Sequence, residues 1–151
     1  MEPPYTGGCQ CGAIRYEITE KPITLYACHC TDCQKQSASA FGMTFRIHSD
    51  ALKITAGTPQ EWHTVADSGN AKIAHFCGAC GTRLYNAPQR HPGALSIKAG
   101  TLDDTSWLKP VGSVWTRSAQ PWVMIPPSPL NHETQPDSMQ SFVDAWQEKN
   151  G

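Results

Sequence analysis

The stretch Gly7-Gly8-Cys9-Gln10-Cys11-Gly12 places two cysteines in a turn framed by glycines, and a similar turn follows at Cys77-Gly78-Ala79-Cys80-Gly81. Thiolates spaced this closely can converge on one metal ion, whereas scattered cysteines need help from the fold to do so. A third group, Cys28-His29-Cys30-Thr31-Asp32-Cys33, lies between them, and the three groups hold all seven cysteines of the chain. The cysteine pattern therefore predicts two metal sites.

The number of ligands divides the cysteines into two unequal sets. A structural zinc is tetrahedral and takes four protein ligands, whereas a catalytic zinc keeps one position open. The two outer pairs together complete one closed site, which ties the N-terminal hairpin to the middle of the chain, and the middle group is one ligand short. The predicted ligands are Cys9, Cys11, Cys77 and Cys80 for a structural zinc, and Cys28, Cys30 and Cys33 for an open, second zinc.

The start of the chain favours a reducing compartment. Met1 to Gly8 has neither the positively charged segment nor the apolar segment of a secretory signal, and no apolar run approaches the length of a membrane span. We therefore expect a cytosolic protein, in which thiols stay reduced and bind metal rather than form disulfides. An odd number of cysteines, seven, also fits disulfide pairing badly.

Composition indicates an ordinary soluble domain and argues against nucleic-acid binding. The chain has 151 residues, with 39% hydrophobic and 17% charged residues, which predicts one domain spanning residues 1–151. Proteins that bind nucleic acids present basic patches, whereas here 12 basic residues face 13 acidic ones. We expect neither a nucleic-acid nor a membrane partner, and the sequence is compatible with a homodimer.

Short runs with strand periodicity predict a mainly β fold of antiparallel strands. In Ala13 to Ile18, for example, apolar and polar residues alternate directly after the first cysteine pair. Glycine, proline, asparagine and aspartate separate most of these runs. The further runs expected to form strands are 23–27, 40–47, 52–55, 61–65, 71–76, 83–85 and 94–99.

Two helices and a proline-rich arm complete the predicted elements. Residues 31–37 are expected to form a short helix with Thr31 as its N-cap. Residues 138–149 are expected to form a longer helix, because Met139, Phe142, Val143 and Trp146 make one apolar stripe at helical spacing. Between the two, residues 109–136 are rich in proline and predict an extended arm anchored by Trp115 and Trp122.

The middle cysteines indicate thiol chemistry. Three thiolates leave zinc with little Lewis acidity, so such a site generates hydroxide poorly and is better suited to bind a thiol as thiolate. Other interpretations are open: His29 as a fourth ligand, a closed site completed by His63, His75 or an aspartate, or an iron–sulfur cluster. His29 lies between two ligating cysteines, where strand alternation points its side chain away from them.

Four segments, at residues 7–16, 28–35, 76–82 and 99–104, lie within a stretch of roughly residues 5–125 that holds all seven cysteines and forms the core of the predicted domain. This stretch resembles the glutathione-dependent formaldehyde-activating enzyme family, which shares its domain with centromere protein V. The resemblance implies an Mss4-like β fold (a β-tent with zinc knuckles), the two zinc sites above, and carbon–sulfur lyase chemistry that joins formaldehyde to glutathione. Where this family often has arginine and glycine after the middle cysteines, the chain has Gln34 and Ala38.

Two functions remain as hypotheses. In the first, zinc at Cys28, Cys30 and Cys33 activates a low-molecular-weight thiol such as glutathione for reversible addition to a small aldehyde, with backbone amides at 34–37 or the Lys35 ammonium as donors to the alkoxide. In the second, the chain is a non-enzymatic zinc module that binds a protein partner through its arm and C-terminal helix.

Overall fold

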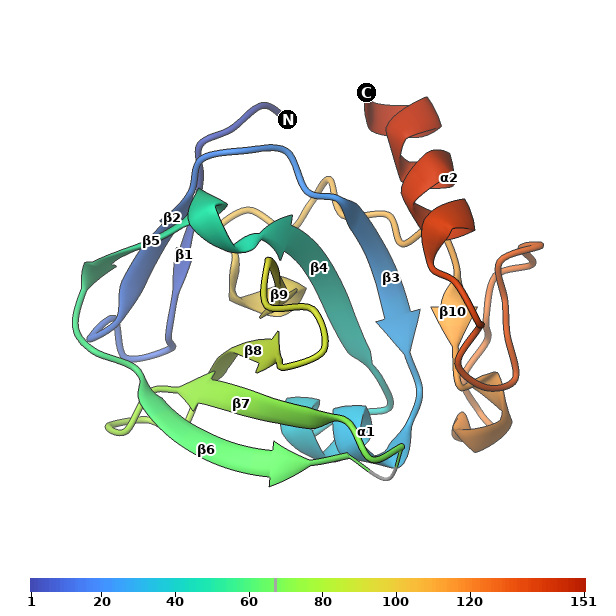
Figure 1. Ribbon diagram of the computed structural model, residues 1–151, viewed down its shortest axis with the longest axis horizontal. Coiled ribbons are helices and arrows are strands. Elements are labelled where there is room, and N and C mark those ends of the chain that lie inside the picture. Colours follow the sequence, from blue (N-terminus) through green and yellow to red (C-terminus); the bar gives the residue numbers. More distant parts are fainter. Residues whose placement is uncertain (67) are drawn as a thin grey trace. The chain divides into compact units, whose positions relative to one another are not determined.

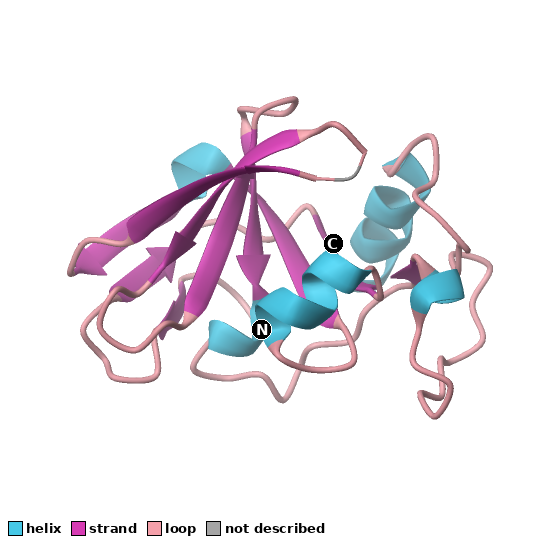
Figure 2. Cartoon of the chain, turned by 90° about the horizontal axis from the view of Figure 1, so that it is seen from below, coloured by secondary structure: helices cyan, strands magenta, loops and turns pink. Residues whose placement is uncertain are grey.

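The computed structural model describes residues 1–66 and 68–151, and strands make up most of its regular structure (Figure 2). The chain forms two compact units. The first comprises Met1–Pro22 and Arg46–Trp107, and the second comprises Ile23–Phe45 and Leu108–Gly151. Strand β4 (Gly42–His48) begins in the second unit and ends in the first.

A small antiparallel sheet in the first unit follows directly from the alternating sequence. Its strand order is β1-β2-β5, with β1 at Tyr5–Gly8, β2 at Arg15–Ile18 and β5 at Leu52–Ala56. Tyr16 and Ile18 point into the core because alternate residues of a strand face opposite sides. The first cysteine pair therefore lies in the loop of the β1–β2 hairpin.

The remaining strands of the first unit form an antiparallel meander that Figure 1 shows in green to yellow. Its core side chains include Ala74, Leu84 and Ile97, which are fully buried. The second cysteine pair lies in the loop between the second and third of these strands. The strands are β6 (Gln60–Val65), β7 (Ala71–Phe76), β8 (Arg83–Pro88) and β9 (Ala94–Lys98).

The second unit is built around β3 (Thr24–Cys28), all five residues of which are buried. A two-residue strand, β10 (Ser113–Val114), pairs with β3 in parallel. The sequence predicts neither this strand nor a parallel pair, because two residues inside a proline-rich segment carry no readable periodicity. Strand β1 was not predicted either, whereas every strand that the alternation predicted is present.

Helix α2 (Gln140–Asn150) packs against β3, as Figure 1 shows. The predicted apolar stripe is its packing face, because Phe142 and Trp146 are buried. Thr24 of β3 donates its hydroxyl to the Phe142 carbonyl oxygen at 2.9 Å, and Tyr26 meets the Phe142 ring edge-on. The mainly β fold with a C-terminal helix is thus confirmed.

Two local predictions were wrong. Helix α1 (Thr31–Ser37) has Cys30 rather than Thr31 as its N-cap, because Cys30 is extended and its sulfur accepts the Cys33 N–H. Trp122 does not anchor the arm: 72% of it is exposed, and its indole N–H donates to Gln120 two residues away. No helix among the described residues has both the length and the apolar character to cross a bilayer.

Candidate metal centres

The two outer cysteine pairs meet in the first unit, as their spacing predicted. Their four sulfur atoms lie within 4.8 Å of one another, although the pairs come from separate hairpin loops. The sulfur of Cys11 is 3.5 Å from that of Cys9 and 3.8 Å from that of Cys77. These separations are far longer than a disulfide bond of about 2.05 Å.

Both loops turn in the same way because each has a glycine directly after its second cysteine. Gly12 and Gly81 have φ angles of +79° and +80°, a left-handed conformation that costs glycine least. Gly12 donates its N–H to the Cys9 carbonyl oxygen, and Gly81 donates to that of Cys77. The turns thereby hold each cysteine pair on one side of its loop.

The spacing of this cluster fits a tetrahedral zinc. A zinc–sulfur bond of about 2.3 Å places tetrahedral sulfurs about 3.8 Å apart, close to the observed separations. Backbone hydrogen bonds also point at the sulfurs, since Ile14 donates its N–H to Cys9 at 3.2 Å. Such donors stabilise thiolates that ligate a metal.

Thr82 links the two loops of the outer cluster. Its hydroxyl oxygen accepts the Gln10 N–H at 3.1 Å and lies 3.2 Å from the Cys80 sulfur. Because the oxygen already accepts from Gln10, its hydrogen is available to the sulfur. This hydroxyl lowers the pKa of the Cys80 thiol to about 5, so the sulfur is poised as a thiolate.

The middle cysteines form a second cluster in the second unit, with sulfur atoms again within 4.8 Å of one another. Cys28 ends β3, Cys30 caps α1, and Cys33 lies in the first turn of that helix. Cys33 donates its N–H to the Cys30 sulfur at 3.3 Å. Three thiols are thus gathered by a strand end and one helical turn.

The proton balance of this cluster favours a bound cation. Hydrogen bonds from Cys28 and Cys33 lower the pKa of the Cys30 thiol to about 2, while its bonds to Cys30 and Cys33 raise the pKa of Cys28 well above the usual range. The Cys30 thiol ionises readily, whereas the Cys28 thiol resists ionisation, because neighbouring thiolates repel each other. A dication with soft-ligand affinity relieves that repulsion, so the donor set fits zinc.

No fourth ligand completes this cluster among the described residues, since no histidine or carboxylate joins its three sulfurs. The His29 imidazole, one of the alternatives, instead lies 5.2 Å from the Phe41 ring between ring centroids. Burial lowers the pKa of His29. The partition into four and three cysteines that the sequence predicted is therefore what the fold brings together.

The glutathione-dependent formaldehyde-activating enzyme family matches residues 4–118 of the chain. The chain belongs to this family. The match contains both cysteine clusters and ends within the proline-rich arm. The resemblance inferred from the four sequence segments is therefore confirmed.

Two relatives have provisional names that refer to the same enzyme family. A *Talaromyces marneffei* protein provisionally named glutathione-dependent formaldehyde-activating enzyme is 27% identical over 72% of this chain and 62% of its own length. An *Emericella nidulans* protein of the same provisional name is 32% identical over 60% of this chain and 48% of its own length. The chain thus spans roughly half to three fifths of the length of these relatives.

A crystal structure of a *Rhodobacter sphaeroides* protein shares the fold. It aligns with a TM-score of 0.54 and 16% sequence identity, covering 66% of this chain and 89% of that protein. At this identity the likeness concerns the fold alone.

Sequence reasoning missed the side chains that support the two cysteine clusters. Thr82 was visible two residues after Cys80, but its contact with Gln10 depends on two loops meeting. Gln34 donates to the backbone of both His29 and Ser118, at 2.8 and 2.9 Å. The position of Gln34 directly after Cys33 was a sequence signal for its contact with His29. Nothing in the neighbouring sequence indicated its contact with Ser118.

Proposed function

We propose that the chain is a zinc-dependent carbon–sulfur lyase-type enzyme that joins a low-molecular-weight thiol, such as glutathione, to formaldehyde or another small aldehyde. The observation that carries the proposal is the three-sulfur cluster of Cys28, Cys30 and Cys33, to which no other described side chain adds a ligand. We also propose a cytosolic location, where glutathione is abundant and thiols stay reduced.

The two clusters have different proposed roles. Cys9, Cys11, Cys77 and Cys80 form a complete ligand set, so we assign them a structural zinc. Cys28, Cys30 and Cys33 are assigned the catalytic zinc. Zinc bound there would supply a soft cationic centre with one open position, at which a substrate thiol loses its proton at neutral pH.

The reaction requires little acid–base machinery from the chain. The thiol S–H bond breaks, a carbon–sulfur bond forms to the aldehyde carbon, and the carbonyl oxygen takes up a proton to give a hydroxymethyl thioether. The chain positions the thiolate by fixing Cys30 and Cys33 through the short helix α1. The same atoms move in reverse when the adduct dissociates.

The proposed alkoxide donors need revision. The Gln34 backbone N–H already donates to the Cys30 carbonyl oxygen at 3.0 Å, so it is not available to substrate. Lys35 follows Cys33 by two positions, and helix residues at that spacing do not face each other. We therefore assign the final proton transfer to solvent.

Exchange spectroscopy with ¹³C-labelled formaldehyde and glutathione tests the proposal, because the enzyme should accelerate interconversion of free aldehyde and adduct. Cys30→Ser is expected to abolish the acceleration and to retain about one of two zinc ions per chain, measured by elemental analysis. Lys35→Ala, an exposed position on the same helix, serves as the matched control and should keep both zinc ions and the activity. Full activity with two zinc ions in Cys30→Ser would refute the assignment.

The second candidate, a non-enzymatic module for a protein partner, is supported by exposed apolar side chains on the arm. Trp122 is 72% exposed and Met124 is 93% exposed. Cobalt-substituted protein separates the two functions. A change in the thiolate charge-transfer bands on adding glutathione supports the enzyme, and unchanged bands support the module.

A further inference from the structure

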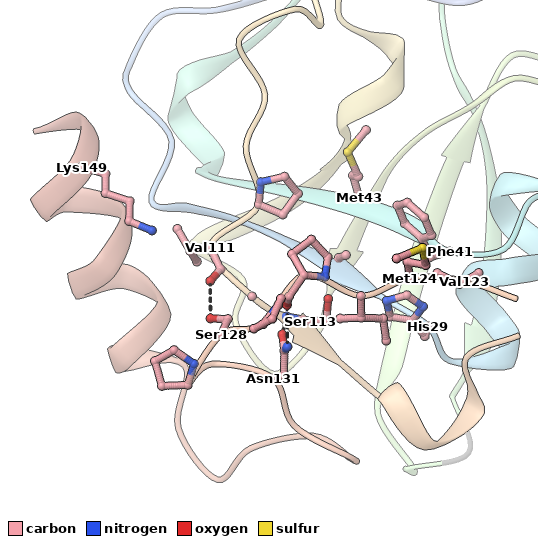
Figure 3. A pocket seen from close by; sticks show the side chains of 17 residues that line it. His29, Phe41, Met43, Val111, Ser113, Val123, Met124, Ser128, Asn131 and Lys149 are labelled. Atoms are coloured by element: carbon pink, nitrogen blue, oxygen red, sulfur yellow. Dashed lines mark hydrogen bonds between the residues drawn. The ribbon is translucent and has the colours of Figure 1, made fainter. Parts of the chain in front are cut away.

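A cavity of about 530 Å³ lies in the second unit, walled by β3, the start of β4, the proline-rich arm and α2 (Figure 3). Its volume falls in the range of small-molecule sites in proteins. Most of the wall is apolar, including Phe41, Met43, Val111 and Val123. No cysteine is among the described residues that line it, so the thiol reaction proposed above does not account for the cavity.

The cavity and the middle cysteine cluster lie on opposite sides of the chain at the end of β3. Ala27 and His29 line the cavity, whereas Cys28 between them belongs to the cluster. This follows from strand geometry, because successive side chains point to opposite faces.

The start of β4 shows the same division. Phe41 and Met43 line the cavity, whereas Gly42 between them faces the cysteines: a Cβ atom on Gly42 would lie 3.4 Å from the Cβ of Cys33. The cavity and the cysteine cluster therefore lie on opposite faces of these two segments, and the cavity is a separate site.

Most polar groups in the cavity wall hold the wall together. Ser128 donates its hydroxyl to the Val111 carbonyl oxygen at 3.0 Å, drawn as a dashed line in Figure 3. Asn131 donates its amide to the Pro126 carbonyl oxygen at 2.9 Å and accepts the Ser113 N–H at 3.1 Å. These bonds fix the arm over the cavity and leave few polar groups for a ligand.

His29 and Lys149 are the nitrogen-bearing side chains that remain, beside the hydroxyl of Ser113. His29 is 2% exposed, and its Nδ1 has no hydrogen-bond partner among the described residues. A buried polar atom without a partner is unfavourable, and a ligand in the cavity could supply the missing hydrogen-bond partner. Lys149 extends from α2 towards the cavity, and Figure 3 shows it at the end opposite His29.

The charged side chains around the cavity indicate whether its ligand carries a positive or a negative charge. Lys149 makes no salt bridge with any described residue, and no acidic side chain is among the described residues that line the cavity. A cationic ligand would meet an unpaired ammonium, whereas an anionic one would neutralise it.

We propose that this cavity binds a small organic acid with an apolar body, its carboxylate at Lys149 and a hydrogen-bonding group at His29. The apolar wall takes the hydrocarbon, and the two polar side chains at its ends orient it. This site goes beyond the proposed function and does not depend on it, because the ligand needs no thiol and no aldehyde.

Calorimetry on the zinc-loaded full chain tests the charge preference with octanoate, ω-hydroxyoctanoate and octylamine as probes. We expect both acids to bind, the hydroxy acid about fivefold more tightly because it gives His29 a partner, and the amine to give no binding. Lys149→Glu should weaken octanoate binding about tenfold. Lys53→Glu makes the same charge change at an exposed position outside the cavity and should leave binding unchanged.

The location is tested independently of any variant by backbone amide NMR of the native chain. Octanoate should shift the amide signals of Met43, Gly112 and Ser113 and leave those of β2 unchanged. His29→Phe should remove the preference for the hydroxy acid while octanoate still binds. Equal binding of octylamine, equal effects of Lys149→Glu and Lys53→Glu, or amide shifts confined to residues outside the cavity would each overturn the proposal.

Discussion

Gln34 donates its side-chain amide to the carbonyl oxygen of Ser118 at 2.9 Å, across 84 residues of sequence. The same nitrogen donates to the His29 carbonyl oxygen at 2.8 Å, and Gln120 donates back to the Gln34 oxygen at 3.3 Å. Gln34 thus joins the helix that carries Cys33 to the proline-rich arm.

Replacing this side chain should release the arm. Gln34→Ala removes both hydrogen bonds to backbone carbonyls, so we expect the free energy of unfolding to fall by about 2 kcal/mol. Tryptic cleavage after Arg117, which adjoins Ser118, should become faster and is followed by mass spectrometry. Lys35→Ala on the same helix is the control, and equal cleavage rates in the two variants would contradict the contact's role.

The cysteine clusters could be predicted because their information is local. Ligands one to three residues apart are brought together by a single turn, and glycines such as Gly12 mark those turns. The strands could be predicted for the same reason, since alternation within a few residues identifies the buried face of β2.

The remaining features depend on chain segments that are distant in sequence. β10 exists because the arm returns to the edge of β3, and no periodicity within Ser113–Val114 indicates that. Cys30 is the N-cap in place of Thr31 because Cys30 is extended and its sulfur accepts the Cys33 N–H, although general propensity favours a hydroxyl at this position. Trp122 was predicted to anchor the arm, whereas anchoring depends on a surface for the indole ring to cover, and Trp122 is 72% exposed.

The C-terminus of α1 should gain stability from one glycine. Ala38 has φ 50° and ψ 39°, a left-handed conformation in which its Cβ costs about 1 kcal/mol. Ala38→Gly is therefore expected to raise the melting temperature. Ala119 has φ −59°, so Ala119→Gly should lower it. A decrease in both variants would show that the strain is absent.

The Thr82 hydroxyl should strengthen metal binding at the outer cluster. Thr82→Val keeps the shape but removes the hydroxyl that bridges Gln10 and Cys80, and such supporting contacts typically change metal affinity by about tenfold or more. We expect faster zinc transfer to a chromogenic chelator, for about one of the two ions. Thr105→Val, at an exposed position, is the control, and an unchanged transfer rate in Thr82→Val would contradict the assignment.

The buried Tyr16 should make stability fall at alkaline pH. Thr101 donates its hydroxyl to the Lys98 carbonyl oxygen, so at 2.7 Å the Tyr16 hydroxyl is the donor to Thr101. Burial raises the pKa of Tyr16 to about 12, above the value near 10 of an unfolded chain. The contribution of the neutral Tyr16 hydroxyl to the free energy of unfolding is therefore complete below pH 10. It is lost as the pH rises towards 12, at roughly 1 kcal/mol per pH unit.

Tyr16→Phe separates this ionisation from that of the other tyrosines. The variant should be about 1 kcal/mol less stable than the native chain at pH 7, because Thr101 loses its donor. Between pH 10 and 12 the difference should shrink and then change sign, since the native chain loses roughly 2 kcal/mol over this range and phenylalanine has no proton to lose. Urea unfolding at a series of pH values measures both quantities, and a difference that stays constant up to pH 12 would show that Tyr16 ionises as readily in the folded protein as in the unfolded one.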